Sequence, residues 1–199
     1  AGTINVYMGL DRPPESFGLT THENFINPDD DHDAAWEGTK RLEPPRAVLA
    51  TLYNHVYPAI SPPGTSIVVL TALSYGAPWV ALNPARYHDT KMRLADAMIA
   101  TAERYAPGLR DACEVVEVAT PLTNMRYAGN LGGSIYGFDQ PPYDSFALRA
   151  GHRGPVPGLW LAGAWTQPGG GFGPCITSGW MAADAVVRSA RKAGGRGHA

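Results

Sequence analysis

The sequence predicts an α+β fold in which a mixed or antiparallel sheet packs with helices, and three segments carry this prediction. Residues 3–10 alternate apolar and polar side chains with a period of two, as a half-buried strand does. Residues 65–73 are rich in β-branched and aliphatic side chains, which favours a well-buried strand. Asn83-Pro84 then provides an N-cap and a first-turn proline, and apolar side chains recur at helical spacing up to Pro107-Gly108.

The remaining elements are expected where short apolar runs lie between loop-forming residues. Pro44-Pro45 ends a short helix, and Pro121 begins one or two helical turns. Residues 128–156 form a long loop rich in glycine and proline, and a loop of this length in a compact domain is usually functional or disordered. The other expected elements are strands over residues 21–26, 47–54 and 114–119, a helix over residues 34–41, and helical turns over residues 121–127.

The last part of the sequence has the pattern strand, glycine turn and helix. A short apolar strand is expected over residues 159–161, a glycine-rich turn over 163–174, and a helix from about Ile176. Basic residues in the last turn of this helix and Gly194-Gly195 beyond it favour a helix end there.

The composition excludes several classes of protein. Of the 199 residues, 44% are hydrophobic and 17% are charged, and the net charge is -2. This balance gives no electrostatic reason to expect nucleic acid or an anionic membrane as a partner. No apolar run is long enough for a transmembrane segment. Cys113 and Cys175 could pair, but two free thiols in an intracellular protein are the favoured interpretation, so we expect a cytoplasmic location, with peripheral membrane association as the alternative.

No metal site is predicted. The six histidines are scattered, and no pair has the spacing of metal ligands. Residues 29–33 are acidic but lack the glycine and the bidentate glutamate of a calcium loop, so a solvated acidic loop is favoured.

The glycine turn near the end of the sequence has the chemistry of a ligand site. Three consecutive glycines, residues 169–171, let the backbone approach a flat ligand closely. The N-terminus of the following helix offers unpaired N–H groups and a partial positive charge, which could stabilise negative charge on a reduced flavin ring. Taken alone, the pattern favours an ordinary tight connection, because such turns are common. It is also not a dinucleotide fingerprint, since Ile176 stands where the third glycine belongs.

Two longer stretches give this turn a context. The first runs from Gly158 through Gly171 and Gly173 into the alanine-rich helix, and the second comprises residues 120–127 and the segment Asn-Leu-Gly-Gly-Ser-Ile-Tyr-Gly at 130–137. Both resemble signature segments of the phytoene desaturase family, which also includes carotenoid isomerases and retinol saturase-like enzymes. Residues 4–10 and 18–20 are similar to the start of the substrate domain of that family. The matches occur in order over nearly the whole chain, which makes them more specific together than either is alone.

The resemblance implies an FAD-dependent oxidoreductase of the amine-oxidase-like superfamily, with a glutathione-reductase-like fold. In that family an N-terminal βαβ unit holds the adenosine and pyrophosphate of FAD, and this sequence has no such unit. We therefore expect a substrate domain over residues 1–157, with an active-site loop over 120–157. Residues 158–193 would complete an FAD-binding domain, and residues 194–199 would form a flexible tail. The missing unit would come from a partner chain, from the other half of a cleaved precursor, or from the rest of a complex.

The resemblance also implies a set of site residues. Many flavoproteins of the wider superfamily carry an acidic residue after the strand that corresponds to 159–161, where this sequence has Ala164 and Trp165. That contact with the ribityl–phosphate part of the cofactor would then come from a backbone N–H or from the partner. For Cys175, a small buried residue is favoured over a redox role. The expected cofactor-binding residues are Gly163, Ala164, Gly170, Gly171, Phe172, Gly173, Pro174, Cys175 and Ile176.

Arg126, Tyr127 and Tyr136 are the candidate residues of a substrate cavity. The alternative is a surface arginine and packed tyrosines. Phe138 and Tyr143 in the long loop could line an apolar site or simply hold the loop in place.

The resulting hypothesis is a flavin-dependent oxidoreductase that desaturates, saturates or isomerises an apolar or conjugated small molecule by hydride transfer to or from FAD. Strands 3–10, 47–54 and 65–73 would form the roof over the substrate. The sequence indicates no catalytic acid or base. The second hypothesis is a non-catalytic binding or scaffolding subunit that retains the flavoprotein fold, and the missing βαβ unit motivates it. The retained glycines argue against it, because a scaffold has little need of them.

Overall fold

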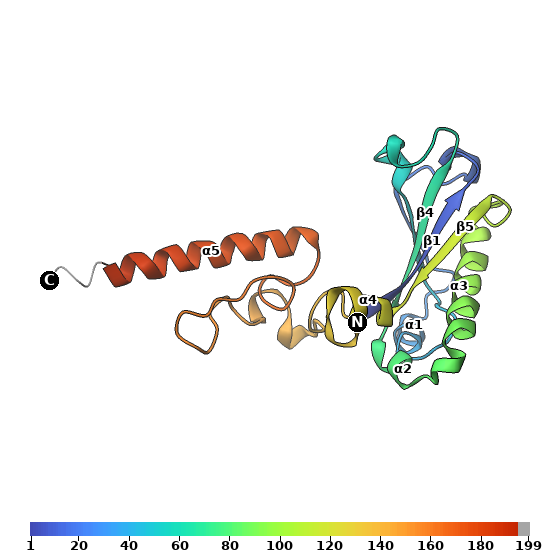
Figure 1. Ribbon diagram of the computed structural model, residues 1–199. Coiled ribbons are helices and arrows are strands. Elements are labelled where there is room, and N and C mark those ends of the chain that lie inside the picture. Colours follow the sequence, from blue (N-terminus) through green and yellow to red (C-terminus); the bar gives the residue numbers. More distant parts are fainter. Residues whose placement is uncertain (195–199) are drawn as a thin grey trace. The chain divides into compact units, whose positions relative to one another are not determined.

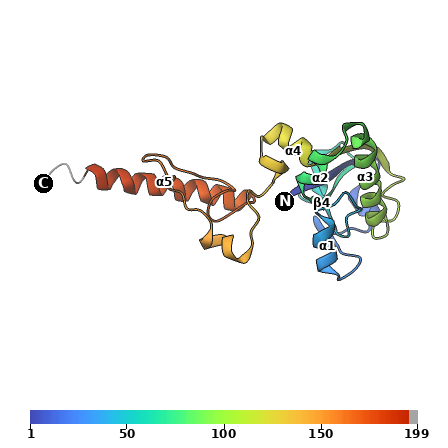
Figure 2. The ribbon, with the colours of Figure 1, turned by 90° about the horizontal axis from the view of Figure 1, so that it is seen from below.

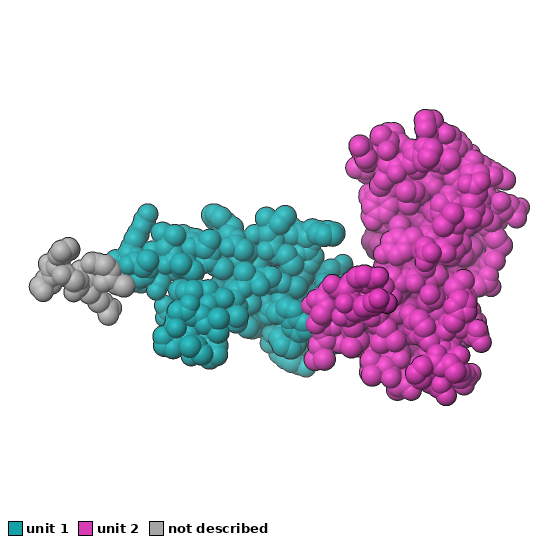
Figure 3. Space-filling model, in the orientation of Figure 1, with its two compact units in different colours: residues 1, 135–199 teal, residues 2–134 magenta. Residues whose placement is uncertain are grey.

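The computed structural model describes residues 1–194, and contacts divide the chain into two compact units (Figure 3). The larger comprises Gly2–Ser134 and is called the sheet unit below. The second comprises Ala1 and the residues from Ile135 onward and is called the turn unit. The sequence predicted a boundary at residues 157/158, between a substrate domain and the segment that completes an FAD-binding domain. That boundary stays a prediction. The predicted flexible tail, beyond Gly194, lies outside the described residues.

The sheet unit contains a five-stranded antiparallel sheet in the order β2-β3-β4-β1-β5 (Figure 1). The central strands β1 and β4 pair over their whole length, with Val6 opposite Leu70. Because side chains alternate along a strand, Ile4, Val6 and Met8 all point to one face and are buried there. The α+β prediction is confirmed, and all pairings in the sheet are antiparallel. The strands are β1 (Gly2–Leu10), β2 (Glu23–Ile26), β3 (Val48–Leu52), β4 (Ser66–Ser74) and β5 (Cys113–Ala119).

Helix α3 (Tyr87–Glu103) packs along the buried face of this sheet, as Figures 1 and 2 show. Its apolar stripe, which includes Leu94, Met98 and Ala102, contributes to the core. The predicted N-cap is confirmed, because the Asn83 side chain accepts a hydrogen bond from the Ala85 N–H at 2.9 Å. The first turn, Pro84–Arg86, is a 3-10 turn.

The other helices of the sheet unit are short. Helix α1 (His32–Gly38) begins two residues earlier than predicted, because Asp31 caps it by accepting the Ala34 N–H. Helix α2 (Gly76–Ala81) was not predicted, since six residues with a glycine and a proline carry no clear periodicity. Helix α4 (Pro121–Ala128) has the predicted proline start and a capping box between Thr120 and Thr123.

The opposite face of the sheet is exposed only in part, since Val69 and Thr51 near its centre are each 6% exposed, and it is called the open face below. Strand pairing places Tyr7 beside Val69, and Val69 beside Thr51, on this face. The ring of Tyr7 is 44% exposed, whereas the neighbouring core residues on β1 are buried. Other side chains that share this face are Thr3, Asn5, Glu23, Phe25, Leu49, Ile67, Thr71, Leu73, Val115, Glu117 and Ala119.

The turn unit is built from loops and one long helix, α5 (Phe172–Gly194). The predicted strand at 159–161 is wrong: Trp160 forms only an isolated bridge with Arg153. A strand needs a neighbouring strand along its edge, and the described residues of this unit provide one bridging residue. Helix α5 begins four residues before the predicted Ile176. Pro174 is tolerated there because the first-turn N–H groups of a helix have no intrahelical acceptor.

The long loop predicted over residues 128–156 contains three short 3-10 turns, at Leu131–Gly133, Pro142–Asp144 and Phe146–Leu148. Both cysteines are free thiols. Partial burial raises the pKa of the Cys113 thiol above its ordinary value. Within residues 1–194, none of the helices is both long and apolar enough to span a bilayer.

Candidate functional site

The structure brings together two segments that the sequence places far apart. One is the glycine turn, residues 163–174, and the other is the loop that contains Tyr136 and Gly137. A Cβ added to Gly170 would lie 2.5 Å from the Cα of Tyr136, and one added to Gly137 would lie 2.6 Å from the Ala164 carbonyl oxygen. Both approaches are closer than any real side chain allows. The glycines at 137 and 170 are therefore needed for the two segments to touch.

A buried hydroxyl network attaches the glycine turn to α5. The Gly163 N–H donates to Ser178 Oγ at 2.9 Å, and Thr166 Oγ1 donates to the Gly163 carbonyl at 3.0 Å. The two hydroxyls also lie 2.8 Å apart, and both residues are buried. Sequence reasoning missed this pair. Its only signal was a serine inside an otherwise apolar helical stripe, which is unfavourable unless it has a partner.

Replacing Ser178 with alanine is expected to lower the free energy of unfolding of the turn unit by about 1–3 kcal/mol. The substitution leaves the partly buried Gly163 N–H without its acceptor. The matched control is Thr177→Ala, on the neighbouring and exposed position of α5, for which we expect a change within about 0.5 kcal/mol. Hydrogen exchange of the Gly163 amide, compared in the two variants, measures the difference, and equal protection in both would contradict the role given to the network.

The backbone of the glycine turn is open toward one side. Gly163 and Gly171 have φ values of +103° and +109°, which favour glycine, and at Gly163 and Gly173 a Cβ would meet no atom within 4 Å. The Cys175 N–H donates to the Gly171 carbonyl at 2.9 Å, and Pro174 has no N–H. The N–H groups of Phe172 and Gly173 are thus the donors that the start of α5 presents. These features fit a flat group with an electron-rich edge, such as the ring of a flavin.

Helix α5 carries an exposed apolar face. Phe172, Ile176 and Trp180 follow one another at intervals of four residues, and their side chains are 96%, 75% and 72% exposed. Residues four apart lie on the same side of a helix, so these side chains form one continuous surface. The sequence had indicated an apolar stripe here. The described residues of the turn unit do not bury it.

The predicted cavity residues fall in both units. Arg126 and Tyr127 lie on α4 of the sheet unit, where the guanidinium stacks 5.5 Å from the ring centroid of an exposed Tyr127. Tyr136 belongs to the turn unit. A cavity shared by these three residues therefore stays a prediction. Phe138 packs edge-on against Trp165, with 4.7 Å between the ring centroids. Tyr143 is exposed.

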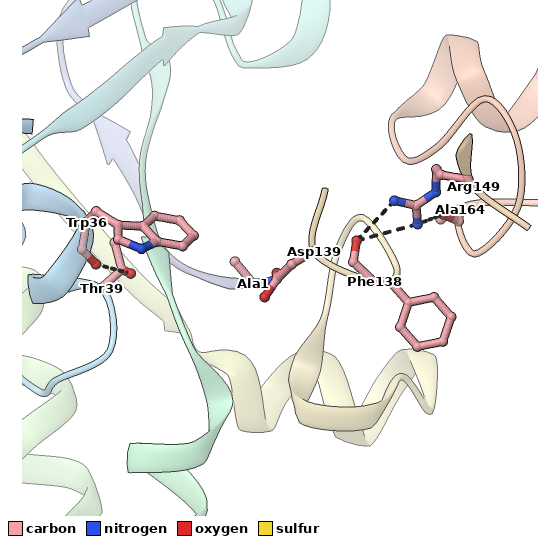
Figure 4. Close-up of polar contacts among 7 residues, drawn as sticks. All are labelled: Ala1, Trp36, Thr39, Phe138, Asp139, Arg149 and Ala164. Carbon is pink, nitrogen blue, oxygen red and sulfur yellow. Dashed lines mark hydrogen bonds and ion pairs between the residues drawn. The ribbon is translucent and has the colours of Figure 1, made fainter. Parts of the chain in front are cut away.

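Arg149 is a further residue of this site that the sequence did not single out. It is only 3% exposed, and its guanidinium donates to the carbonyls of Phe138 and Ala164 at 3.4 and 3.0 Å (Figure 4). It also donates to the Asp144 carbonyl at 3.4 Å. Three segments of the turn unit are thereby held by one cation. An arginine in a loop gives no sequence signal of burial, because arginine is usually exposed.

Comparison with known proteins identifies the family of this chain. The model of the family of flavin containing amine oxidoreductases matches residues 2–187. The all-trans-retinol 13,14-reductase of Danio rerio is 25% identical over 178 residues, which cover 80% of this chain and 29% of that protein. Two chloroplastic prolycopene isomerases, 1 and 2, of an Oncidium hybrid cultivar are each 27% identical over 157 residues, which cover 74% of this chain and 25% of each isomerase.

The chain therefore spans less than a third of the length of these relatives. The family match covers the sheet unit, the glycine turn and most of α5. The chain belongs to the flavin containing amine oxidoreductase family, within which it is a phytoene desaturase-, carotenoid isomerase- and retinol saturase-like oxidoreductase sequence.

Proposed function

We propose that this chain is the substrate-side part of an FAD-dependent oxidoreductase that desaturates, saturates or isomerises an apolar or conjugated small molecule. The observation that carries the proposal is the glycine turn, whose open backbone and free helix N–H groups are held in place by the Tyr136–Gly137 loop. FAD, when bound, would supply hydride transfer. The residues of this chain would bind the ring edge through Phe172 and Gly173 N–H groups and exclude water from it.

The open face of the sheet supports an apolar substrate. None of the five strands contains a lysine or an arginine, and the side chains on the open face are mainly aliphatic, aromatic or hydroxyl-bearing, with Asn5, Glu23 and Glu117 as the exceptions. The pKa of Tyr7 is raised above its ordinary value, mainly by partial burial of the side chain and secondly by the neighbouring Tyr53. The phenol of Tyr7 therefore stays protonated at neutral pH and is a hydrogen-bond donor on this face, where Glu117 on β5 is its cross-strand neighbour. We propose that this face forms the roof over the substrate.

A further part of the protein, either a partner chain or another section of a longer precursor, would complete the cofactor site. Two observations support this. The chain matches under a third of the length of its relatives, and α5 presents an apolar face that the described residues leave exposed. An exposed apolar surface of this kind marks an interaction site. The missing part would supply the dinucleotide-binding unit and cover Phe172, Ile176 and Trp180.

The test is the visible absorption of the protein purified from its natural source together with everything that remains bound to it. We expect the bands of an oxidised flavin, release of FAD on denaturation, and a second polypeptide or a longer chain by intact mass and N-terminal sequencing. The chain alone, saturated with FAD, should lose it on gel filtration. A complex that stays colourless after incubation with FAD would overturn the enzyme proposal and leave the scaffolding subunit.

A further inference from the structure

Arg149 occupies an unusual position for a permanently charged side chain. Removing a guanidinium from water is costly unless hydrogen bonds replace the lost solvation. The acceptors that the structure provides are backbone carbonyls, from Phe138, Asp144 and Ala164, while Nε has no hydrogen-bond partner among the described residues. The shortest of these bonds, at 3.0 Å, goes to Ala164, which lies in the glycine turn. A buried cation that binds loop carbonyls fixes the direction of the peptide groups it contacts.

The direction of the Ala164–Trp165 peptide has a consequence for the next N–H. In a trans peptide group the C=O and the following N–H point in opposite directions. The Arg149 guanidinium binds the Ala164 carbonyl (Figure 4). The Trp165 N–H of the same trans peptide therefore points away from that guanidinium. Gly137 packs on the flat side of the same peptide, since a Cβ there would lie 2.6 Å from the Ala164 oxygen and 3.1 Å from the Trp165 nitrogen. Two contacts, one at its edge and one at its flat side, thus fix this peptide.

The neighbouring N–H groups of the turn are already used. Thr166 N–H donates to the Gly163 carbonyl at 3.1 Å, and Gln167 N–H donates to the Ala150 carbonyl at 2.9 Å. Among the described residues, no hydrogen bond takes the Trp165 N–H. By the resemblance described above, this donor would stand where many flavoproteins of the wider superfamily carry an acidic residue toward the ribityl–phosphate part of the cofactor. A backbone N–H and a carboxylate differ in the partner they select, since the N–H binds an oxygen acceptor and favours an anionic one.

We propose that Arg149 is a positioning residue that aims the Trp165 N–H at an oxygen of the ribityl–phosphate part of FAD. The proposal rests on the proposed function, because it presupposes that this family member binds FAD. It explains why an arginine is buried at a point where a neutral side chain would be less costly. It also explains how a site with alanine and tryptophan at 164 and 165 can hold that part of the cofactor.

The first experiment measures FAD binding to the complete protein, with its dinucleotide-binding part, after removal of the flavin. In Arg149→Met the side-chain volume is retained and the carbonyl contacts are lost, so we expect the dissociation constant of FAD to rise about tenfold, and the visible bands of the bound flavin to shift. Arg149→Lys keeps the charge without the planar fork and should recover part of the affinity. The matched control is Arg153→Met, because Arg153 is exposed and stacks on Trp160, 5.4 Å from its ring centroid.

The second experiment removes the donor and keeps the Arg149 side chain. Replacing the Ala164–Trp165 amide by an ester, through ligation of a synthetic C-terminal segment, deletes the N–H and also makes the Ala164 carbonyl a weaker acceptor for Arg149. We expect a similar weakening of FAD binding, and no further loss when Arg149→Met is added, because both changes remove the same contact. Parallel titrations with FMN and riboflavin identify the acceptor: weakening with FMN but not with riboflavin assigns it to the phosphate, and weakening with both assigns it to a ribityl hydroxyl.

Two outcomes separate the failure of this proposal from the failure of the proposed function. If the unmodified protein binds FAD and the ester variant binds it with an affinity within twofold, the Trp165 N–H does not contact the cofactor and the role of Arg149 is overturned. If the unmodified protein binds no FAD, the flavoenzyme proposal fails first. The ester arm decides the question even if Arg149→Met does not fold.

Discussion

Replacing Gly133 with alanine is expected to lower the free energy of unfolding of the sheet unit by about 3 kcal/mol, through overpacking and backbone strain together. A Cβ at this position would lie 2.2 Å from the carbonyl oxygen of Pro121 and 2.6 Å from its Cα. These are backbone atoms at the start of α4, so no side-chain rotation can relieve the clash. The φ of Gly133 is also +65°, a left-handed conformation that costs any other residue extra free energy.

The matched control is Gly129→Ala, four residues earlier. Gly129 has nearly the same φ, +68°, but a Cβ there would meet nothing within 4 Å. It should therefore cost only the conformational penalty, about 1 kcal/mol. Urea unfolding followed by circular dichroism gives both values. Equal losses in the two variants would show that the contact with Pro121 relaxes without cost, and that the close packing described here does not matter for stability.

The same segment explains part of the family resemblance in terms of packing. A Cβ at Gly76 would lie 2.2 Å from the carbonyl oxygen of Gly132, and one at Gly2 would lie 2.6 Å from that of Gly133. The Gly132-Gly133 pair thus brings the starts of β1, α2 and α4 into backbone contact. The first part of the 130–137 signature is therefore a structural junction of the sheet unit. Its last two residues, Tyr136 and Gly137, have the different task of holding the glycine turn.

The sequence was sufficient for the strands and the main helix of the sheet unit because their signals are local. Alternation along β1 and helical spacing along α3 each report which side of an element is buried, and the structure confirms both. The prediction of a strand at 159–161 was wrong because it also relied on a local signal alone. An apolar run reports that a segment is to be buried, but strand formation also requires a partner, and Trp160 pairs only with Arg153.

The contacts that shape the candidate site could not be predicted in this way. Arg149 and Ser178 act on the glycine turn through bonds to backbone atoms at least 15 positions away in sequence, and no periodicity records such bonds. Helix α5 shows the complementary limit. Its apolar stripe was visible in the sequence, but a stripe does not say what covers it, and Phe172 is 96% exposed in the structure.

Replacing Gly170 with alanine in the complete flavoprotein is expected to reduce turnover by about a hundredfold, the cost of displacing reacting groups by about 1 Å. A Cβ at Gly170 would lie 2.5 Å from both the Cα and the Cβ of Tyr136, and 2.7 Å from its carbonyl oxygen. Ordinary contacts begin near 3.4 Å, so the glycine turn and the Tyr136 loop would have to move apart. The sheet unit contains none of these atoms, and its unfolding should be unchanged.

The control for this variant is Gly151→Ala in the same unit, where a Cβ would meet nothing within 4 Å and φ is not left-handed. Turnover and FAD content are measured together at saturating FAD. If Gly170→Ala loses activity and retains FAD, the turn orients the ring without contributing much to its affinity. If it loses both, the turn grips the cofactor. Full activity in Gly170→Ala would mean that the Tyr136 loop can move away without displacing the turn, and the loop would then no longer explain how the donors of α5 are held in place.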